Sequence, residues 1–91
     1  MRFTWHESKR RSNLARHSLD FADAARVFDG PMVLVEDQRY DYGEQRMIGI
    51  GLLGALVVLV VHVESDQTVH IISMRKADTD ETNLFYQNAW I

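Results

Sequence analysis

Runs of β-branched and leucine residues dominate the middle of the chain. The longest is residues 55–64, Ala-Leu-Val-Val-Leu-Val-Val-His-Val-Glu, which has no acidic or basic residue other than His62 before its last position. Because apolar residues occupy both parities, the pattern predicts a central strand covered on both faces. The apolar stretch that begins at Met47 is interrupted by glycines and is shorter than the ~20 residues of a membrane helix. It therefore predicts two strands and a turn.

Helical and alternating patterns place other elements around this strand. Residues 6–17 contain no glycine or proline, which favours a helix. A second, short helix is predicted from an Asp20 cap to Asp29-Gly30-Pro31. The predicted elements are strand 2–5, helix 6–17, helix 20–28, strand 32–35, loop 36–44, strand 45–50, turn 51–54, strand 55–64, turn 65–67, strand 68–76 and a helix starting within 77–81, capped by Thr79 or Asp80.

This order, β-α-α-β-β-β-β-α, predicts an α+β fold. Consecutive strands joined by short links pair antiparallel, so we expect a small antiparallel sheet packed by helices. Ninety-one residues suffice for one modest core, and the whole chain, 1–91, is predicted to be a single domain.

Composition narrows the chemistry. The chain has no cysteine, which excludes disulfides and thiolate metal sites. Its four histidines form no His-x-x-x-His pair, so no metal site and no cofactor are expected. The N-terminal residues lack the apolar segment of a signal peptide, and a cytoplasmic location is therefore expected.

Charge is distributed unevenly along the chain. Residues 1–17 contain five Lys or Arg and one acid, a formal charge of +4, whereas residues 18–91 contain five bases and twelve acids, or −7. A basic end on an acidic chain is typical of a surface that faces a polyanion. The alternative is an ordinary solvated helix face.

Several short patterns keep a characteristic order from Phe3 to Glu81. They are Phe3-x-Trp5, Lys9-x-x-x-Asn13, Arg16-His17, Phe21-x-x-Ala24-x-x-Val27-Phe28-Asp29, Glu44-x-Arg46-x-Ile48-Gly49, Val60-Val61-His62 and Ile71-Ile72-Ser73-x-Arg75-Lys76-Ala77. Together they resemble the BrnT family, the ribonuclease toxins of bacterial type II toxin–antitoxin pairs. The resemblance implies a RelE-like fold and endoribonuclease activity.

The resemblance also implies partners. A cognate antitoxin with a ribbon-helix-helix domain would neutralise the toxin, so DNA would be contacted only through the antitoxin; no membrane partner is expected. Three departures from the family stand out. His70 replaces a frequent Arg, Met74 replaces a small residue, and segment 83–91 is more aromatic than is usual.

Cleavage of RNA without a metal needs a base, an acid and cations around the phosphorus. For a ribonuclease of this family we therefore predict His17, Glu44, Arg46 and Arg75 as catalytic residues, and Lys9, Arg10, Arg16 and Lys76 as RNA-binding residues. Histidine transfers protons near neutral pH, and arginine grips phosphate with two hydrogen bonds. Alternatively, His17 contacts the last carbonyls of its helix, and each of the two catalytic arginines forms an ion pair with Glu44 or another acid.

The two histidines in predicted strands, His62 and His70, are weaker candidates than His17. His62 ends the central run and is predicted to be a core residue. Strand parity places His70 and Arg75 on opposite faces of the sheet unless a bulge intervenes.

Two other functions remain open from the sequence. The chain could be a non-catalytic relative that binds antitoxin or RNA without cutting. It could also be a small structural subunit whose Trp90-Ile91 tail docks on another chain. Incubation of the pure protein with RNA distinguishes an enzyme from a binding module.

Overall fold

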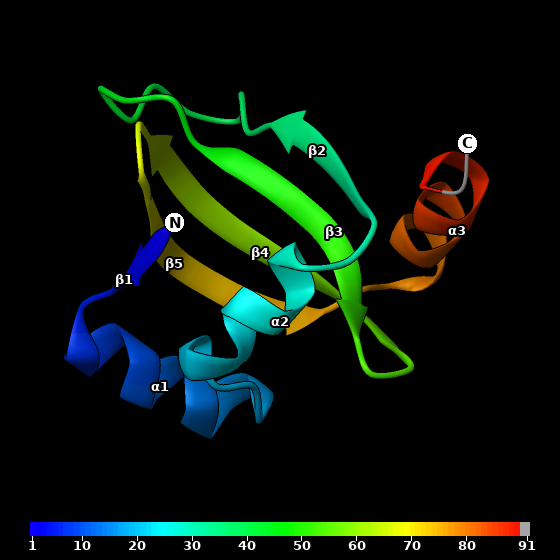
Figure 1. Ribbon diagram of the computed structural model, residues 1–91, viewed down its shortest axis with the longest axis horizontal. Helices are drawn as coiled ribbons and strands as arrows, with labels where there is room; N and C mark the ends of the chain where they lie inside the picture. The colour runs from blue at the N-terminus through cyan, green and yellow to red at the C-terminus, as the bar shows by residue number, and fades with distance from the viewer. Residues whose placement is uncertain (90–91) are drawn as a thin grey trace.

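Five strands form one sheet in the order β1-β5-β4-β3-β2 (Figure 1). The structure is a computed structural model and describes residues 1–89, so the predicted Trp90-Ile91 contact lies outside the described residues. No helix within residues 1–89 is long and apolar enough to cross a membrane. The elements are β1 Arg2–Thr4, α1 Glu7–His17, the 3-10 turn η1 Phe21–Asp23, α2 Ala24–Phe28, β2 Met32–Glu36, β3 Met47–Leu53, β4 Leu56–Ser65, β5 Thr68–Lys76 and α3 Thr79–Asn88.

The predicted α+β class and element order are confirmed, but the sheet is mixed rather than antiparallel. Strands β2 to β5 pair antiparallel with their neighbours, as short links require. Strand β1 instead pairs parallel with β5, with Arg2 opposite Thr68 and Thr4 opposite His70. The short-link argument fails for β1 because its partner lies at the other end of the chain.

The predicted turn at 51–54 is wrong. Strand β3 continues to Leu53, and the hairpin turns at Gly54, whose φ of 63° suits glycine. Leu52 and Leu53 are therefore strand residues that point to opposite faces: Leu53 packs on the core beneath α2, and Leu52 packs on the core beneath α3.

The central strand β4 separates two apolar cores. Val58 and Val60 pack with residues of η1 and α2 on one face, whereas Val57 and Leu59 pack with Phe85 of α3 on the other. His62 is fully buried on the first face, with Nδ1 3.0 Å from the Val60 carbonyl and Nε2 3.1 Å from Glu64 Oε2. This confirms the predicted core histidine.

Coverage of the second face is incomplete. Helix α3 lies at the end of the sheet away from β1 (Figure 1), and its core reaches only as far along β4 as Leu59. Val61 and Val63 are half-buried. The prediction that both faces of the central strand are covered is therefore wrong beyond Val60, and an open strip of sheet remains between α1 and α3.

The start of α3 also differs from the prediction. Asp78, not Thr79 or Asp80, caps the helix: its side chain accepts a hydrogen bond from the Glu81 N–H at 2.8 Å, and Glu81 Oε1 accepts one from the Asp78 N–H at 2.9 Å. This reciprocal pair is a capping box, which satisfies two helix-end donors that Thr79 or Asp80 would leave open.

A bulge in β5 sets which side chains share a face. Val61 pairs with Ser73 but the next residue, His62, pairs with Ile71, so Ile72 is the extra residue. Val69, Ile71 and Met74 consequently enter the first core, and His70 and Arg75 project to the opposite face. The two share a face after all, yet their partners on β4, Val63 and Leu59, are four residues apart, or about 13 Å at ~3.3 Å per residue.

Helix α1 runs along the part of the β5 edge that β1 leaves unpaired (Figure 1). Buried Asn13 fixes it there: its Oδ1 accepts a hydrogen bond from the Met74 N–H at 3.1 Å, and its Nδ2 donates to the Leu19 carbonyl at 3.1 Å. One side chain thus attaches the helix to both the sheet edge and the following turn.

Replacing Asn13 by Ala should destabilise the domain by about 2–6 kcal/mol, because two buried backbone groups lose their partners at about 1–3 kcal/mol each. Chemical denaturation measures the loss, with the exposed neighbour Ser12→Ala as the control. Equal stability of the two variants would contradict the role given to Asn13.

Candidate functional site

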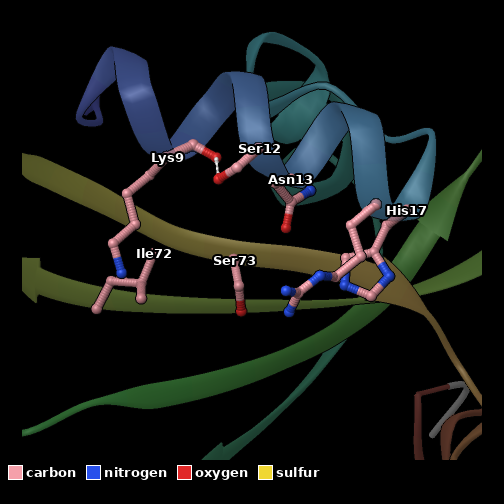
Figure 2. Close-up of a pocket in the computed structure, with 7 residues that line it drawn as sticks. Lys9, Ser12, Asn13, His17, Ile72 and Ser73 are labelled. Atoms are coloured by element: carbon pink, nitrogen blue, oxygen red, sulfur yellow. Dashed lines mark hydrogen bonds between the residues drawn. The ribbon is translucent and has the colours of Figure 1, made fainter.

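Two adjoining cavities open where α1 meets the open strip of the sheet. The first, of about 190 Å³, is lined by Lys9, Ser12, Asn13, Arg16, His17, Ile72 and Ser73 (Figure 2). The second, of about 150 Å³, is lined by His6, Lys9, Glu44, Arg46, His70, Ile71 and Ile72. Both are lined by Lys9 and Ile72, so they lie side by side, and together they are here called the α1 groove.

Side chains that share one side of α1 form one wall of the α1 groove. Lys9, Asn13 and His17 are spaced by four, and Arg16 lies beside them, so all four project from one side of α1. Figure 2 shows Lys9 and His17 extending from opposite ends of the helix toward β5, with Asn13 and Ser73 between them. Arg11 lies about 200° around the helix from Lys9, on the far side.

Only part of the positive charge of α1 faces this groove. Arg10 is bound to Glu7 at 2.6 Å and to Asp20 at 3.1 Å, and Arg11 contacts Glu7 at 3.3 Å. The hydrogen bonds from Arg10 lower the pKa of Glu7 to about 2. Lys9 and Arg16 form no ion pair within residues 1–89. The predicted RNA contact of Arg10 therefore competes with two carboxylates.

Residues 37–46 form a loop that places Glu44 and Arg46 in the lining of the groove. Buried Asp37 organises it, accepting two hydrogen bonds from the Arg39 guanidinium, each of 2.8 Å, and one from the Tyr42 hydroxyl at 3.1 Å. These bonds, first of all those from Arg39, hold the pKa of Asp37 well below its usual range. The Asp37 N–H donates to the Arg46 carbonyl at 2.8 Å, which fixes the end of the loop.

The Arg46 guanidinium contacts two neighbouring side chains, but one of its donors has no hydrogen-bond partner within residues 1–89. Its Cζ lies 4.0 Å above the Tyr42 ring, a cation–π contact, and its Nε is 3.6 Å from Glu44 Oε2. That separation gives charge attraction without a hydrogen bond, so Nε is a buried donor with no partner in residues 1–89. An unpaired buried donor costs about 1–3 kcal/mol.

His17 and the Glu44–Arg46 pair lie at different ends of the groove. The exposed His17 ring forms no hydrogen bond within residues 1–89, so the alternative contact with its helix's last carbonyls does not occur there. Its cavity contains Arg16 and Lys9 but not Glu44. An 11-residue helix spans about 16 Å, so one phosphate cannot contact groups at both ends of α1.

Arg75 and Lys76 lie apart from the α1 groove. Both terminal nitrogens of Arg75 bind Glu81, at 2.8 and 2.7 Å, which matches the ion-pair alternative with Glu81 as the acid. Hydrogen bonds in this pair raise the pKa of Arg75 and lower that of Glu81. Lys76 pairs with Val58 and so lies on the opposite face of the sheet from Arg75. The RNA contacts predicted for Arg75 and Lys76 therefore remain predictions.

His6 and Ser73 also line the groove and were not singled out from the sequence. The His6 ring contacts the His70 ring edge to face, with centroids 5.1 Å apart. The His70 Nδ1 atom lies 2.8 Å from the Thr4 hydroxyl, its cross-strand neighbour in the β1–β5 ladder. In the sequence, His6 and His70 are simply two of four histidines, far apart along the chain. The parallel pairing of β1 with β5 brings their rings together.

The groove therefore combines cations that have no ion pair within residues 1–89 with ionisable imidazole and carboxylate groups on an open, elongated surface. Such an arrangement suits an extended polyanion and proton transfer at one of its phosphates.

Comparisons with known proteins show the family of the chain. Residues 5–81 match the family model described as ribonuclease toxin, BrnT, of type II toxin–antitoxin system. The chain is similar to the crystal structure of the Brucella abortus ribonuclease toxin BrnT, with a TM-score of 0.70 and 29% identity over 87% of this chain and 99% of that chain. No curated protein matches. The chain belongs to the BrnT family, the ribonuclease toxins of type II toxin–antitoxin systems.

Proposed function

We propose that this chain is a metal-independent endoribonuclease that binds RNA along the α1 groove. The observation that carries the proposal is the convergence of unpaired Lys9 and Arg16, and of the partly unsatisfied Arg46, with Glu44 and histidine rings on one surface. These groups can supply the base, the acid and the cations that RNA cleavage requires.

The reaction proceeds by attack of the neighbouring 2′-hydroxyl. A base removes the 2′-hydroxyl proton as the 2′-oxygen bonds to phosphorus, and the bond from phosphorus to the 5′-oxygen breaks. An acid protonates the departing 5′-oxygen. The products are a 2′,3′-cyclic phosphate and a 5′-hydroxyl, so no atom or electron is left over and no co-reactant is required.

The phosphate that reacts is held at the Arg46 end of the groove. There the side chains of Lys9 and Arg46 both line the cavity and can contact it. Glu44 or a histidine transfers the protons. Arg16 and His17 contact the strand further along, and His17→Ala with an unchanged pH–rate profile would remove His17 from the chemistry.

Partners follow from the family and the charge. Membership in a type II family implies an antitoxin, and we propose that it carries a ribbon-helix-helix DNA-binding domain, so that the toxin meets DNA only through it. The complex acts in the cytoplasm, where the RNA is.

Purified protein should cleave RNA in the presence of EDTA, and its induction in cells should stop growth unless the antitoxin is co-expressed. Loss of cleavage on chelation would overturn metal independence. Failure to cleave RNA under any condition, together with tight antitoxin binding, would favour a non-catalytic binding module.

An antitoxin that competes with RNA should cover the α1 groove with acidic side chains. Lys9→Glu should therefore weaken both RNA cleavage and antitoxin binding by about tenfold or more, and make binding less sensitive to salt. Arg11→Glu is the matched control, since Arg11 is on the far side of the same helix. If the two variants bind antitoxin equally tightly across a salt series, the inhibitor acts elsewhere.

A further inference from the structure

Two histidines meet where β1 passes into α1. His6 is the N-cap residue of α1, with an extended backbone, but its side chain makes no capping hydrogen bond. Ser, Thr, Asp and Asn are the residues that normally accept such a bond. The His6 ring lies instead against the His70 ring, with centroids 5.1 Å apart.

Neighbouring groups define the surroundings of this pair. His6 and His70 line the same cavity as Lys9 of α1 and as Glu44 and Arg46 of the 37–46 loop. These three are the charged residues that line this cavity with the two rings. Thr4 is the neutral polar neighbour, and its hydroxyl oxygen forms a 2.8 Å hydrogen bond with His70 Nδ1. The other ring nitrogen of His70, Nε2, has no hydrogen bond within residues 1–89.

We propose that His6 and His70 are the general acid–base couple of the RNA cleavage, acting on a phosphate held by Lys9 and Arg46. The inference rests on the proposed function and assigns its proton transfers to His6, which was not a candidate from the sequence, and to His70, which was a weaker one. One imidazole takes the 2′-hydroxyl proton, and the other, as imidazolium, gives its proton to the 5′-oxygen as the P–O5′ bond breaks. Thr4 is a positioning residue that orients His70.

Chemistry and position favour this pair over the other candidates. Imidazole both accepts and donates protons near neutral pH, as a two-residue couple requires. His17 lies about 16 Å away at the other end of α1, too far to share the phosphate bound by Arg46. The carboxylate of Glu44 faces Arg46 at 3.6 Å and holds that cation in place.

Single-turnover cleavage of RNA should be measured across pH for His6→Gln and His70→Gln. Each should slow cleavage by about a hundredfold or more, the usual contribution of a general acid or base, and each should remove one limb of a bell-shaped pH–rate profile. Arg26→Gln, on α2 and away from the groove, is the control and should keep the wild-type rate within about threefold. His17→Gln should leave both limbs of the profile intact, whatever it does to RNA binding.

Two further measurements separate proton transfer from a structural or purely electrostatic role. A nucleoside 3′-phosphate ester with a good leaving group needs no acid, so it should restore the rate of the variant that lacks the acid and not of the other. His70→Arg keeps a cation but cannot accept a proton at neutral pH, and should be as slow as His70→Gln. Thermal unfolding checks each fold; should His70→Gln not fold, His6→Gln and Thr4→Val carry the test, because His6 is exposed.

An active wild type whose His6 and His70 variants keep its rate and pH profile would overturn this assignment alone. So would full activity of His70→Arg, which would make His70 a phosphate-binding cation. A wild type that does not cleave RNA would overturn the proposed function, and this inference with it.

Discussion

Replacing Val58 by Asp should leave almost no folded protein. The Val58 side chain is fully buried in the central strand, packed beneath η1 and α2. A carboxylate there would have no partner and would cost several kcal/mol, against a total stability of about 5–15 kcal/mol for a domain of this kind. Soluble yield and cooperative thermal unfolding measure the effect.

Val61→Asp is the matched control for this substitution. Val61 is on the same strand three residues further along, but it faces the open strip of the sheet and is half-buried. Its carboxylate can reach water, so this variant should fold and lose far less stability. Similar unfolding of the two variants would show that the central strand is covered on both faces along its whole length.

Removing the Arg46 side chain should reduce RNA cleavage by about a hundredfold while the protein stays folded. This is the typical cost of losing one cationic contact in a transition state. Its Nε has no hydrogen bond within residues 1–89 to lose, so Arg46→Ala should lower the unfolding temperature only through the loss of its contacts with Tyr42 and Glu44. Arg46→Lys, which keeps the charge but not the planar fork, should recover only part of the rate.

Arg26→Ala is the control for a general loss of positive charge. Arg26 belongs to α2 and its side chain is 68% exposed, away from the groove. Its removal should leave cleavage unchanged. If Arg46→Ala lost activity only in proportion to its loss of stability, Arg46 would be a structural residue that packs on Tyr42.

The sequence predicted those features that depend on local pattern. The shared side of Lys9, Asn13 and His17 followed from helical spacing, and β5 has the predicted bounds, Thr68–Lys76, because turn residues flank an apolar run. The hairpin turn was misplaced because glycines at 51 and 54 both look like turn residues. Gly51 instead allows close packing, since a Cβ there would lie 2.8 Å from Val27 Cγ1.

Features that depend on distant residues could not be predicted. The parallel pairing of β1 with β5 joins the two ends of the chain, and it is this pairing that brings His6 to His70. The bulge at Ile72 reverses the parity on which the placement of Arg75 relied. Arg75 was predicted to bind phosphate, with an ion pair to an acid as the alternative, and nothing in the strand pattern shows that this acid would be Glu81 at the start of α3.

The chemistry of the RNA ends tests the central claim most directly. Pure protein and a labelled RNA are incubated in EDTA, and the new termini are identified by mass spectrometry, beside a matched RNA with 2′-deoxyribose at each cleaved position. The account predicts 2′,3′-cyclic phosphate or 3′-phosphate ends, 5′-hydroxyl ends and no cleavage of the deoxy-substituted RNA. Products with 3′-hydroxyl ends, or cleavage of the deoxy-substituted RNA, would contradict it.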